Sequence, residues 1–496
     1  MTDLIPNTSD TAKTASDPRR WWALAVLAAS LLVVVMDMTI LNVALPEMSA
    51  ELELTSVSQL WVVDAYALAL AGLLIPVTAL GDRWGRKRML VTGYAAFAVG
   101  SVAILWADSA AAVIAIRALL GIGGAMVMPS TLSLIRSVFA DARERTLALS
   151  IWGASAALGG AVGPVVGGAL LEHFSWHSAF LVNVPLMAVA IVAGVWLLRE
   201  NRSPRPGRID AVGVLLSAGG MTAFVYAVKQ LGKHGPSLAT LALLVLGVAM
   251  LTAFVRAALA SDRPMLDVRL FANPVLRAGV VAALASSVAM ASVLFVGSQW
   301  LQLVDGRTPL QAGLALLPLA VGAIIASPFA PALAERSSPR IVLAGGLLVL
   351  SAGLGLLALL PATYPFVAVA FAVVGLGTSA LGLGSALIMG VASDDQAGSA
   401  AAVEEITYEL GAVLGITFLG SLVGAVYRAG LPSGADGAVR ESVAGAVGGP
   451  WFADAADAFV TAFASVGAVG ALLTALAAYA VWRLVPADLS LDDVHH

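Results

Sequence analysis

The sequence predicts an all-α integral membrane protein with two six-helix bundles and two extra helices, fourteen transmembrane helices in all. Three observations lead to this prediction. The 496 residues are 59% hydrophobic and only 12% charged, with a mean hydropathy of +0.92. Apolar stretches of roughly 20 residues, enough to cross a ~30 Å hydrocarbon core, recur along the whole chain. Finally, one loop sequence occurs twice, at corresponding places in two halves.

The fourteen apolar stretches account for almost the whole chain. In order they are Trp21–Leu45, Gln59–Leu80, Met89–Trp106, Ala110–Leu134, Leu147–Leu171, Ala179–Leu198, Asp210–Gln230, Leu238–Phe254, Val275–Leu303, Leu310–Leu333, Ile341–Leu360, Phe366–Val391, Ala397–Tyr427 and Ala456–Leu484. No soluble domain remains between them, so ATP-driven transport would need a separate subunit. The sequence contains no phosphate loop, nucleophile triad, clustered metal ligands or nucleic-acid surface, and we expect no enzymatic activity and no cofactor.

A repeated loop divides the chain into two halves. Leu80–Leu90 (LGDRWGRKRML) and Leu333–Leu343 (LAERSSPRIVL) align without a gap, and each follows the second helix of a six-helix block. Repeated halves around a central cavity are a transporter architecture. We therefore expect bundles at 21–200 and 275–485, a linker at 201–274 that holds the two extra helices, and tails at 1–20 and 486–496. The loop 428–455 holds a hairpin or short helix over the outer mouth, or it is disordered.

The Lys and Arg residues are distributed unevenly between alternate loops. Most of the 27 fall in loops that lie on the side of the N-terminus. The loops on the other side carry Lys229, Lys233, Arg307, Arg428 and Arg440. Because basic loops stay in the cytoplasm, both termini are predicted to be cytoplasmic. The preference for Arg over Lys hints at a GC-rich bacterial genome, and so at a bacterial cytoplasmic membrane.

Asp37 is the main candidate for proton coupling. It lies in the apolar stretch Trp21–Leu45, where an ionised carboxylate costs at least ~2.5 kcal/mol. Such a group takes up a proton, pairs with a cation or faces a water-filled cavity, and each option indicates a transporter. Arg117, also within an apolar helix, is expected to face the polar interior near Asp37 and tune its protonation. The alternative is that Arg117 is a structural hydrogen-bond donor to backbone or to Asn42.

Asp64 is a candidate for binding a substrate cation. It is flanked by Trp61 and Tyr66, and an acid beside aromatic rings suits a lipophilic cation. Asp64 also lies near the outer N-terminus of its helix. The alternative reading is therefore a carboxylate stabilised by the helix dipole.

The helix Ala397–Tyr427 contains three further acids, Glu404, Glu405 and Glu409. Glu405 and Glu409 are four residues apart and share a face, whereas Glu404 points roughly 100° away and stacks above Tyr408. Two carboxylates on one face cannot both stay charged cheaply in a low dielectric, so one should bind a proton or a cation. The alternative is an acidic start of a cytoplasmic helix.

Two glycine-containing segments are predicted to control conformational change. In the loop after the second helix, Gly85 permits a tight turn, and Asp82 can pair with Arg83 or Arg86 to close an inner gate. The alternative is a plain positive-inside stop signal. The second segment has glycines that present a smooth face to a neighbouring helix and a proline that bends the helix axis. This combination suits a pivot between conformations, and the alternative is ordinary membrane packing. Its residues are Gly159, Gly163, Pro164, Gly167 and Gly168.

These motifs resemble known signatures. Asp82-Arg83-x-Gly85-Arg86-Lys87, Arg117-x-x-x-Gly121-x-Gly123 and Gly159-x-x-x-Gly163-Pro164-x-x-Gly167-Gly168 look like the three signature motifs of the major facilitator superfamily, the last being its antiporter signature. The stretch 36–46 and Asn183-x-Pro185 resemble the fourteen-helix drug:proton antiporters. The stretches 61–66, 175–181, 264–271 and 400–405 resemble the QacA, SmvA and LfrA group of multidrug exporters, and the similarity covers essentially the whole chain.

The sequence departs from the family pattern at three positions. Thr78 replaces the first glycine of the loop motif, and Leu120 stands where the family has a glutamine near the helix arginine. Ala323 replaces an acid that QacA carries, so a strong preference for divalent cations is not expected.

The resemblance implies an exporter of lipophilic cations, such as quaternary ammonium antiseptics, dyes and biguanides, driven by a proton gradient. It implies proton coupling by Asp37, Glu405, Glu409 and Arg117, and substrate binding by Asp64, Glu404, Trp61, Tyr66, Trp152 and Tyr408. Protons, lipophilic cations and membrane lipids are the expected partners, and a monomer would suffice. Two alternatives are an exporter of a dedicated metabolite or antibiotic and a non-transporting receptor or scaffold on the same fold.

Overall fold

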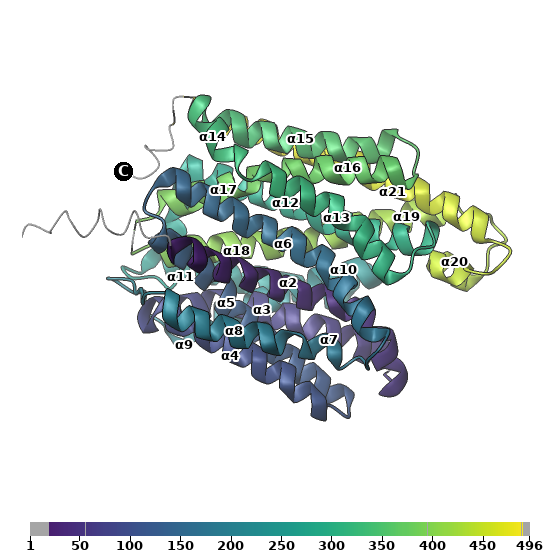
Figure 1. The fold of residues 1–496 in the computed structure, drawn as a ribbon, viewed down its shortest axis with the longest axis horizontal. Coiled ribbons are helices and arrows are strands. Elements are labelled where there is room, and N and C mark those ends of the chain that lie inside the picture. The colour runs from purple at the N-terminus through teal and green to yellow at the C-terminus, as the bar shows by residue number, and fades with distance from the viewer. Residues whose placement is uncertain (1–18, 55, 394, 488, 490–496) are drawn as a thin grey trace, which may run out of the picture.

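A computed structural model of the chain describes residues 19–54, 56–393, 395–487 and 489, and all regular elements in these ranges are helices. The long helices run roughly along the longest axis of the molecule (Figure 1). Thirteen of the described helices are long and apolar enough to span a membrane, and Leu310–Ala326 is a shorter apolar helix. The fourteen predicted spans are therefore present. The predicted tails lie outside the described residues, except that Arg19 and Arg20 already belong to the first helix and that 486, 487 and 489 are described.

Six long helices form the first bundle. They are α2 (Arg19–Glu51), α3 (Ser56–Trp84), α4 (Arg86–Ala103), α5 (Ala110–Val138), α6 (Ala142–Leu171) and α8 (Asn183–Leu197), with the turns η1 (Ile104–Trp106) and α7 (Ser178–Leu181) at their ends. Helix α2 packs against α6, and α5 packs against α3 and α4. Their buried apolar side chains form one continuous core.

The second bundle contains the remaining spans, several of them interrupted. It comprises α12 (Pro274–Gln299) with η4 (Trp300–Val304), α13 (Pro309–Ala326), α14 (Phe329–Arg336), α15 (Pro339–Leu359), α16 (Tyr364–Gly377), α17 (Ser379–Val391), α18 (Ala397–Leu414) with η5 (Gly415–Leu419) and α19 (Gly420–Gly430), and α21 (Phe452–Leu484). Pro328 separates α13 from α14, because proline cannot donate to the helical hydrogen-bond ladder. The two copies of the repeated loop join α3 to α4 and α14 to α15.

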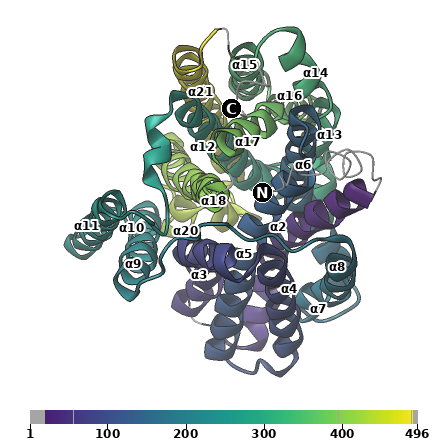
Figure 2. The same cartoon turned by 90° about the vertical axis from the view of Figure 1, so that its left-hand side faces the viewer.

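The linker supplies two helices that lie beside the bundles. A short α9 (Ala211–Val214) and the π-helical turn η2 (Leu215–Gly219) lead into α10 (Gly220–His234), which is followed by α11 (Leu238–Ala260) and η3 (Val268–Ala272). Figure 2 shows α10 and α11 on one side of both bundles. Helix α10 contacts α3 and α18, whereas α11 packs chiefly on α10. Only Gly247, Phe254 and Ala258 are buried in α11, so most of its apolar surface is left for lipid.

The loop 428–455 contains a short helix, α20 (Gly437–Glu441), and a 3₁₀ turn, η6 (Val443–Ala446). The Tyr427 hydroxyl donates to the carbonyl of Val439 at 2.7 Å. The segment packs against α19 and α21 of the second bundle. Of the two readings of this loop, the short helix is the one observed.

The glycine face of α6 is the contact surface for α2. A Cβ at Gly159 would meet the carbonyl oxygen of Leu32 at 2.6 Å, and one at Gly163 would meet that of Met36 at 2.9 Å. A Cβ at Gly167 would meet the side chain of Ile40 at 2.8 Å, whereas Gly168 faces Leu310 of α13. Close packing along this face is therefore observed, and the proposed pivot remains a prediction.

We expect Gly163→Val to separate α2 from α6. Its Cβ would collide with the Thr39 hydroxyl and the Met36 carbonyl, and a backbone atom cannot rotate out of the way. Overpacking of this kind costs about 1–3 kcal/mol. The thermal unfolding midpoint of the detergent-purified variant should fall clearly below that of Gly355→Ala, because nothing lies within 4 Å of a Cβ at Gly355. Equal midpoints would show that the contact is not tight.

Candidate functional site: a central cavity between the bundles

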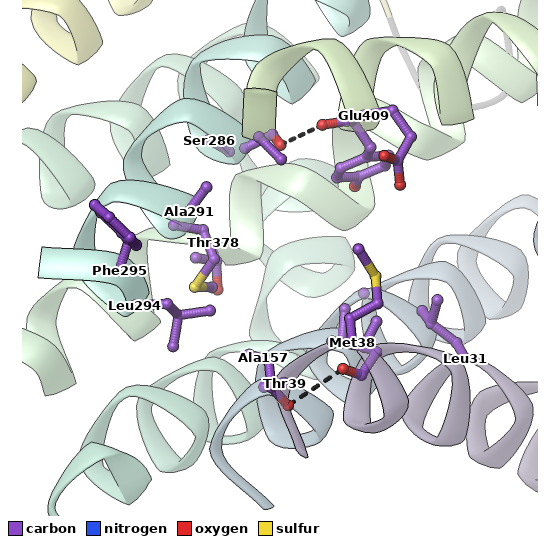
Figure 3. A pocket seen from close by; sticks show the side chains of 18 of the residues that line it. Leu31, Met38, Thr39, Ala157, Ser286, Ala291, Leu294, Phe295, Thr378 and Glu409 are labelled. Atoms are coloured by element: carbon purple, nitrogen blue, oxygen red, sulfur yellow. Dashed lines mark hydrogen bonds between the residues drawn. The ribbon is translucent and has the colours of Figure 1, made fainter. Parts of the chain in front are cut away.

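The two bundles meet along α6, which contacts α13 and α17, and along α3, which contacts α18. Between them lies a cavity of about 310 Å³, here called the central cavity. Its size is within the range of pockets that hold drug-sized molecules. Figure 3 shows Glu409 and Ser286 on one side of it and Leu31, Met38 and Thr39 on the other.

The lining of the central cavity is mostly apolar. Among the described lining residues, Glu405 and Glu409 are the only acids. Both oxygens of Glu405 are buried and have no hydrogen-bond partner in the described part of the chain. Trp152 and Tyr408 also line the cavity, with ring centroids 6.2 Å apart in an edge-on arrangement. A buried carboxyl without a donor beside aromatic rings is suited to a lipophilic cation or a proton.

Asp37 is fully buried and held by two donors from other helices. Arg117 Nη1 lies 2.7 Å from Asp37 Oδ2, and Asn183 Nδ2 donates to Asp37 Oδ1 at 2.8 Å. Arg117 also donates through Nε to the Val62 carbonyl at 3.2 Å and stacks over the Tyr66 ring at 4.5 Å. Arg117 thus lies next to Asp37 and also bonds to backbone, so both predicted arrangements occur together.

Asp37 does not line the central cavity. Its neighbours Met38 and Thr39 do, so the carboxyl is on the far side of the α2 backbone from the cavity acids. No role was predicted for Asn183 from the sequence. The signal was present, since Asn183-x-Pro185 places a lone amide at the start of an apolar helix, where it needs a polar partner. The side chain of Asn42, the other partner considered for Arg117, is outside the described residues.

Four residues that were predicted to bind substrate do not line the central cavity. Trp61 is 41% exposed and stacks on Tyr226 of α10. Tyr66 is buried under Arg117. Glu404, which points roughly 100° away from Glu405 around α18, accepts a hydrogen bond from Ser385. This correction follows from helix geometry, since periodicity shows which residues share a face but not which face meets the cavity.

Asp64 is the fourth residue that was predicted to bind substrate but does not line the central cavity. Its carboxylate pairs with Lys229 of α10 at 2.9 Å. Lys229 was counted with the outer loops, although the predicted stretch Asp210–Gln230 already contained it, and in the structure it lies inside α10, which continues to His234. A linker helix therefore supplies a base to the first bundle. Neither reading of Asp64 anticipated this partner.

The loop motif forms a buried ion pair at the end of the bundles that carries Arg83, Arg86 and Arg136, here called the basic end. Asp82 pairs with Arg86, whose side chain is only 3% exposed, while Arg83 is exposed. A Cβ at Gly398, at the start of α18, would collide with both members of the pair. The pair is thus buried under the second bundle, which a stop signal alone would not require.

Two further features lie at the basic end. Gly85 has φ +123°, a conformation that favours glycine, and it lets α4 begin directly after α3. Arg136 of α5 donates to two carbonyl oxygens at the end of α17. One belongs to Met389 in its last turn, at 2.5 Å, and the other to Ala392, the residue that follows the helix. These contacts join the two bundles at this end. Their role as a gate remains a prediction.

Comparison with known proteins identifies the family. Residues 27–307 match the model of the Major Facilitator Superfamily. The multidrug efflux pump LfrA of Mycolicibacterium smegmatis is 41% identical over 456 residues, which are 90% of this chain and 90% of LfrA. The chain belongs to the major facilitator superfamily, whose members are transporters rather than enzymes, and it is a multi-pass membrane protein.

Further relatives are also named for drug efflux or resistance. The methyl viologen resistance protein SmvA of Salmonella typhimurium is 36% identical over 424 residues, covering 84% of this chain and 85% of SmvA. The drug efflux pump JefA of Mycobacterium tuberculosis is 30% identical over 443 residues, covering 87% and 85%. The solved proton:xylose symporter XylE shares the fold, with a TM-score of 0.61 at 14% identity over 96% of this chain and 99% of XylE.

Proposed function

We propose that this protein exports lipophilic organic cations across the bacterial cytoplasmic membrane in exchange for protons. The observation that carries the proposal is the carboxyl of Glu405, which lines an apolar cavity and has no donor among the described residues. Keeping an unsatisfied acid in such a place is costly, so it should have a ligand during the transport cycle. The aromatic rings of Trp152 and Tyr408 favour a ligand that is both positive and apolar.

The exchange follows from electrostatics. A proton on Glu405 or Glu409 removes the charge that attracts the substrate, and a bound cation disfavours protonation of the same group. Loading one ligand therefore releases the other. Asp37 would carry the coupling proton at a separate position, where its charge is balanced by Arg117.

The orientation in the membrane follows from the charges. The basic end should face the cytoplasm, and with it both termini. The contacts of Arg86 and Arg136 would keep the path from the central cavity to the cytoplasm closed in this conformation. The proton gradient would supply the energy without a cofactor, and one copy of the chain would suffice for transport.

The relatives' names support the cationic substrates. SmvA is named for resistance to methyl viologen, which is an organic cation, and LfrA is named a multidrug efflux pump. A second candidate function is export of one dedicated antibiotic. It is favoured by similarity to the puromycin resistance protein of Streptomyces alboniger, 32% identical over 413 residues, or 82% of each chain. The charged residues among the described lining of the central cavity are Glu405 and Glu409, and such a lining does not favour anionic cargo. A non-transporting scaffold would not need buried carboxyls in this place.

Ethidium transport in proteoliposomes tests the proposal. The pH gradient is imposed in one sample and collapsed by an ionophore in a matched one, and puromycin, an antibiotic without a permanent charge, is compared under the same conditions. We expect ethidium movement that needs the gradient. Movement of the antibiotic alone would support the second candidate, and transport of neither would contradict both.

A further inference from the structure

Three residues of the central cavity carry buried side-chain oxygens that have no hydrogen-bond partner among the described residues. They are Glu405, with both carboxyl oxygens, and Ser286 and Tyr408, with their hydroxyls. Ser286 lies on α12 and is 1% exposed, and Glu405 on α18 is fully buried. An unbonded oxygen in such a place is costly, and more so when it is charged. The proposed exchange uses Glu405 but gives Ser286 no role.

Ser286 is held close to Glu405 by the contact between α12 and α18. The adjacent Ser287 donates from Oγ to the Tyr408 carbonyl at 2.7 Å. A Cβ at Gly411 would meet the Ser287 Cβ at 2.6 Å, so the two helices touch at this level. Glu405 precedes Tyr408 by less than one helical turn, about 4.5 Å along the axis of α18. One ligand head group can therefore contact both Ser286 and Glu405.

The other aliphatic hydroxyls of the described lining are satisfied within the protein. Each donates to a backbone carbonyl oxygen, at 2.6 to 3.1 Å, and they belong to Thr39, Ser287, Ser298 and Thr378. Ser286 has the same chemistry but no such bond among the described residues, and Figure 3 shows it on the same side of the cavity as Glu409. Its hydroxyl is therefore available to a molecule inside the cavity.

The unbonded oxygens require hydrogen-bond donors, because a carboxylate can only accept. A quaternary ammonium ion would balance the charge of Glu405 but has no N–H group to bond to it. A guanidinium or amidinium ion carries the same charge and presents N–H groups in a planar fork that matches a carboxylate. Such an ion loses more hydration on entering an apolar cavity, so it gains over a quaternary ion only where acceptors are waiting.

We propose that the central cavity selects, among lipophilic cations, those with a planar fork of N–H donors over quaternary ammonium ions. The carboxyl of Glu405 accepts two N–H groups of the ligand, and Ser286 Oγ accepts a third. The ring of Trp152, which also lines the cavity, offers a face on which the planar head group can stack. The inference rests on the proposed export of cations, narrows its substrate class, and makes Ser286 a specificity-determining residue.

Hexylguanidinium and hexyltrimethylammonium test the inference, because they share one tail and one permanent charge and differ in their N–H donors. Each competes with ethidium for the detergent-purified full chain, and the ratio of the two affinities is the readout. We expect hexylguanidinium to bind about tenfold more tightly to the intact chain. Ser286→Ala should lower this ratio about three- to tenfold, as expected for the loss of one hydrogen bond.

Two further variants sharpen the test. Ser292→Ala is the matched control on the same helix, since the Ser292 hydroxyl donates to the Val288 carbonyl at 2.6 Å and Ser292 is not part of the described cavity lining. It should leave the ratio unchanged. Glu405→Gln replaces one acceptor by an NH₂ donor that faces the fork, so it should weaken the binding of both ions and bring the ratio to one or below.

The outcomes separate this inference from the proposed function. If ethidium binds but the intact chain holds both hexyl ions equally or prefers the quaternary one, the export of cations stands and the inference is wrong. If the preference exists but Ser286→Ala and Ser292→Ala behave alike, Ser286 does not contact the ligand, which overturns the site. If the intact chain binds neither ethidium nor the hexyl ions, the proposed function fails and the inference fails with it.

Discussion

Asp37→Asn should reduce gradient-driven ethidium transport to the level of protein-free liposomes. The substitution keeps the shape of the side chain and its contact with Asn183, but it removes the group that can take up a proton and balance Arg117. Binding of ethidium should persist, because Asp37 does not line the central cavity. Transport in proteoliposomes and dye binding in detergent, measured on the same preparation, check both halves of this result.

A double variant separates coupling from folding. Asp37→Asn alone leaves the buried guanidinium of Arg117 without its carboxylate, which can destabilise a protein by about 3–5 kcal/mol. Asp37→Asn/Arg117→Gln removes both charges and should recover much of that stability. We expect it to remain inactive in transport. Restored transport in the double variant would mean that the pair is structural and that the coupling proton is carried elsewhere.

Glu405→Gln should weaken ethidium binding by about tenfold or more, equivalent to about 1.4 kcal/mol or more. The variant removes a charge from the cavity lining while conserving volume. It should also raise the thermal unfolding midpoint by a few degrees, because the wild-type carboxyl is buried without a donor among the described residues. Opposite changes in binding and stability distinguish a functional acid from a structural one.

Glu404→Gln is the matched control, since it makes the same change at the adjacent residue. Glu404 accepts a hydrogen bond from Ser385 and is not part of the described cavity lining. We expect its effect on ethidium binding to be several times smaller than that of Glu405→Gln. A larger loss at Glu404 would place the cation on the other face of α18.

Hydropathy was sufficient to predict the helices, because a lipid-exposed segment must be apolar for about 20 residues whatever its neighbours are. α11 is the simplest case, with few buried residues and a sequence that is apolar all round. The contact between Arg117 and Asp37 could also be predicted, because an isolated charge in lipid needs a partner and few candidates exist. Asn183 follows the same rule.

The lining of the central cavity was harder to predict. The four-residue spacing of Glu405 and Glu409 correctly put them on one face, but nothing in the sequence indicates which neighbour that face meets. Glu404 and Trp61 were assigned to substrate binding, but neither lines the central cavity. Lys229 was missed because its partner, Asp64, is far away in sequence, and only the packing of α10 brings the two together.

The most direct test is to measure protons released when ethidium binds. The purified chain in weakly buffered detergent is titrated with the dye while a pH indicator reports the solution, with Glu405→Gln as the control. If the cation and the proton compete for the same carboxyls, binding should release protons from the intact chain, fewer from Glu405→Gln, and should weaken as the pH falls. Ethidium binding without proton release at any pH would contradict the proposed exchange.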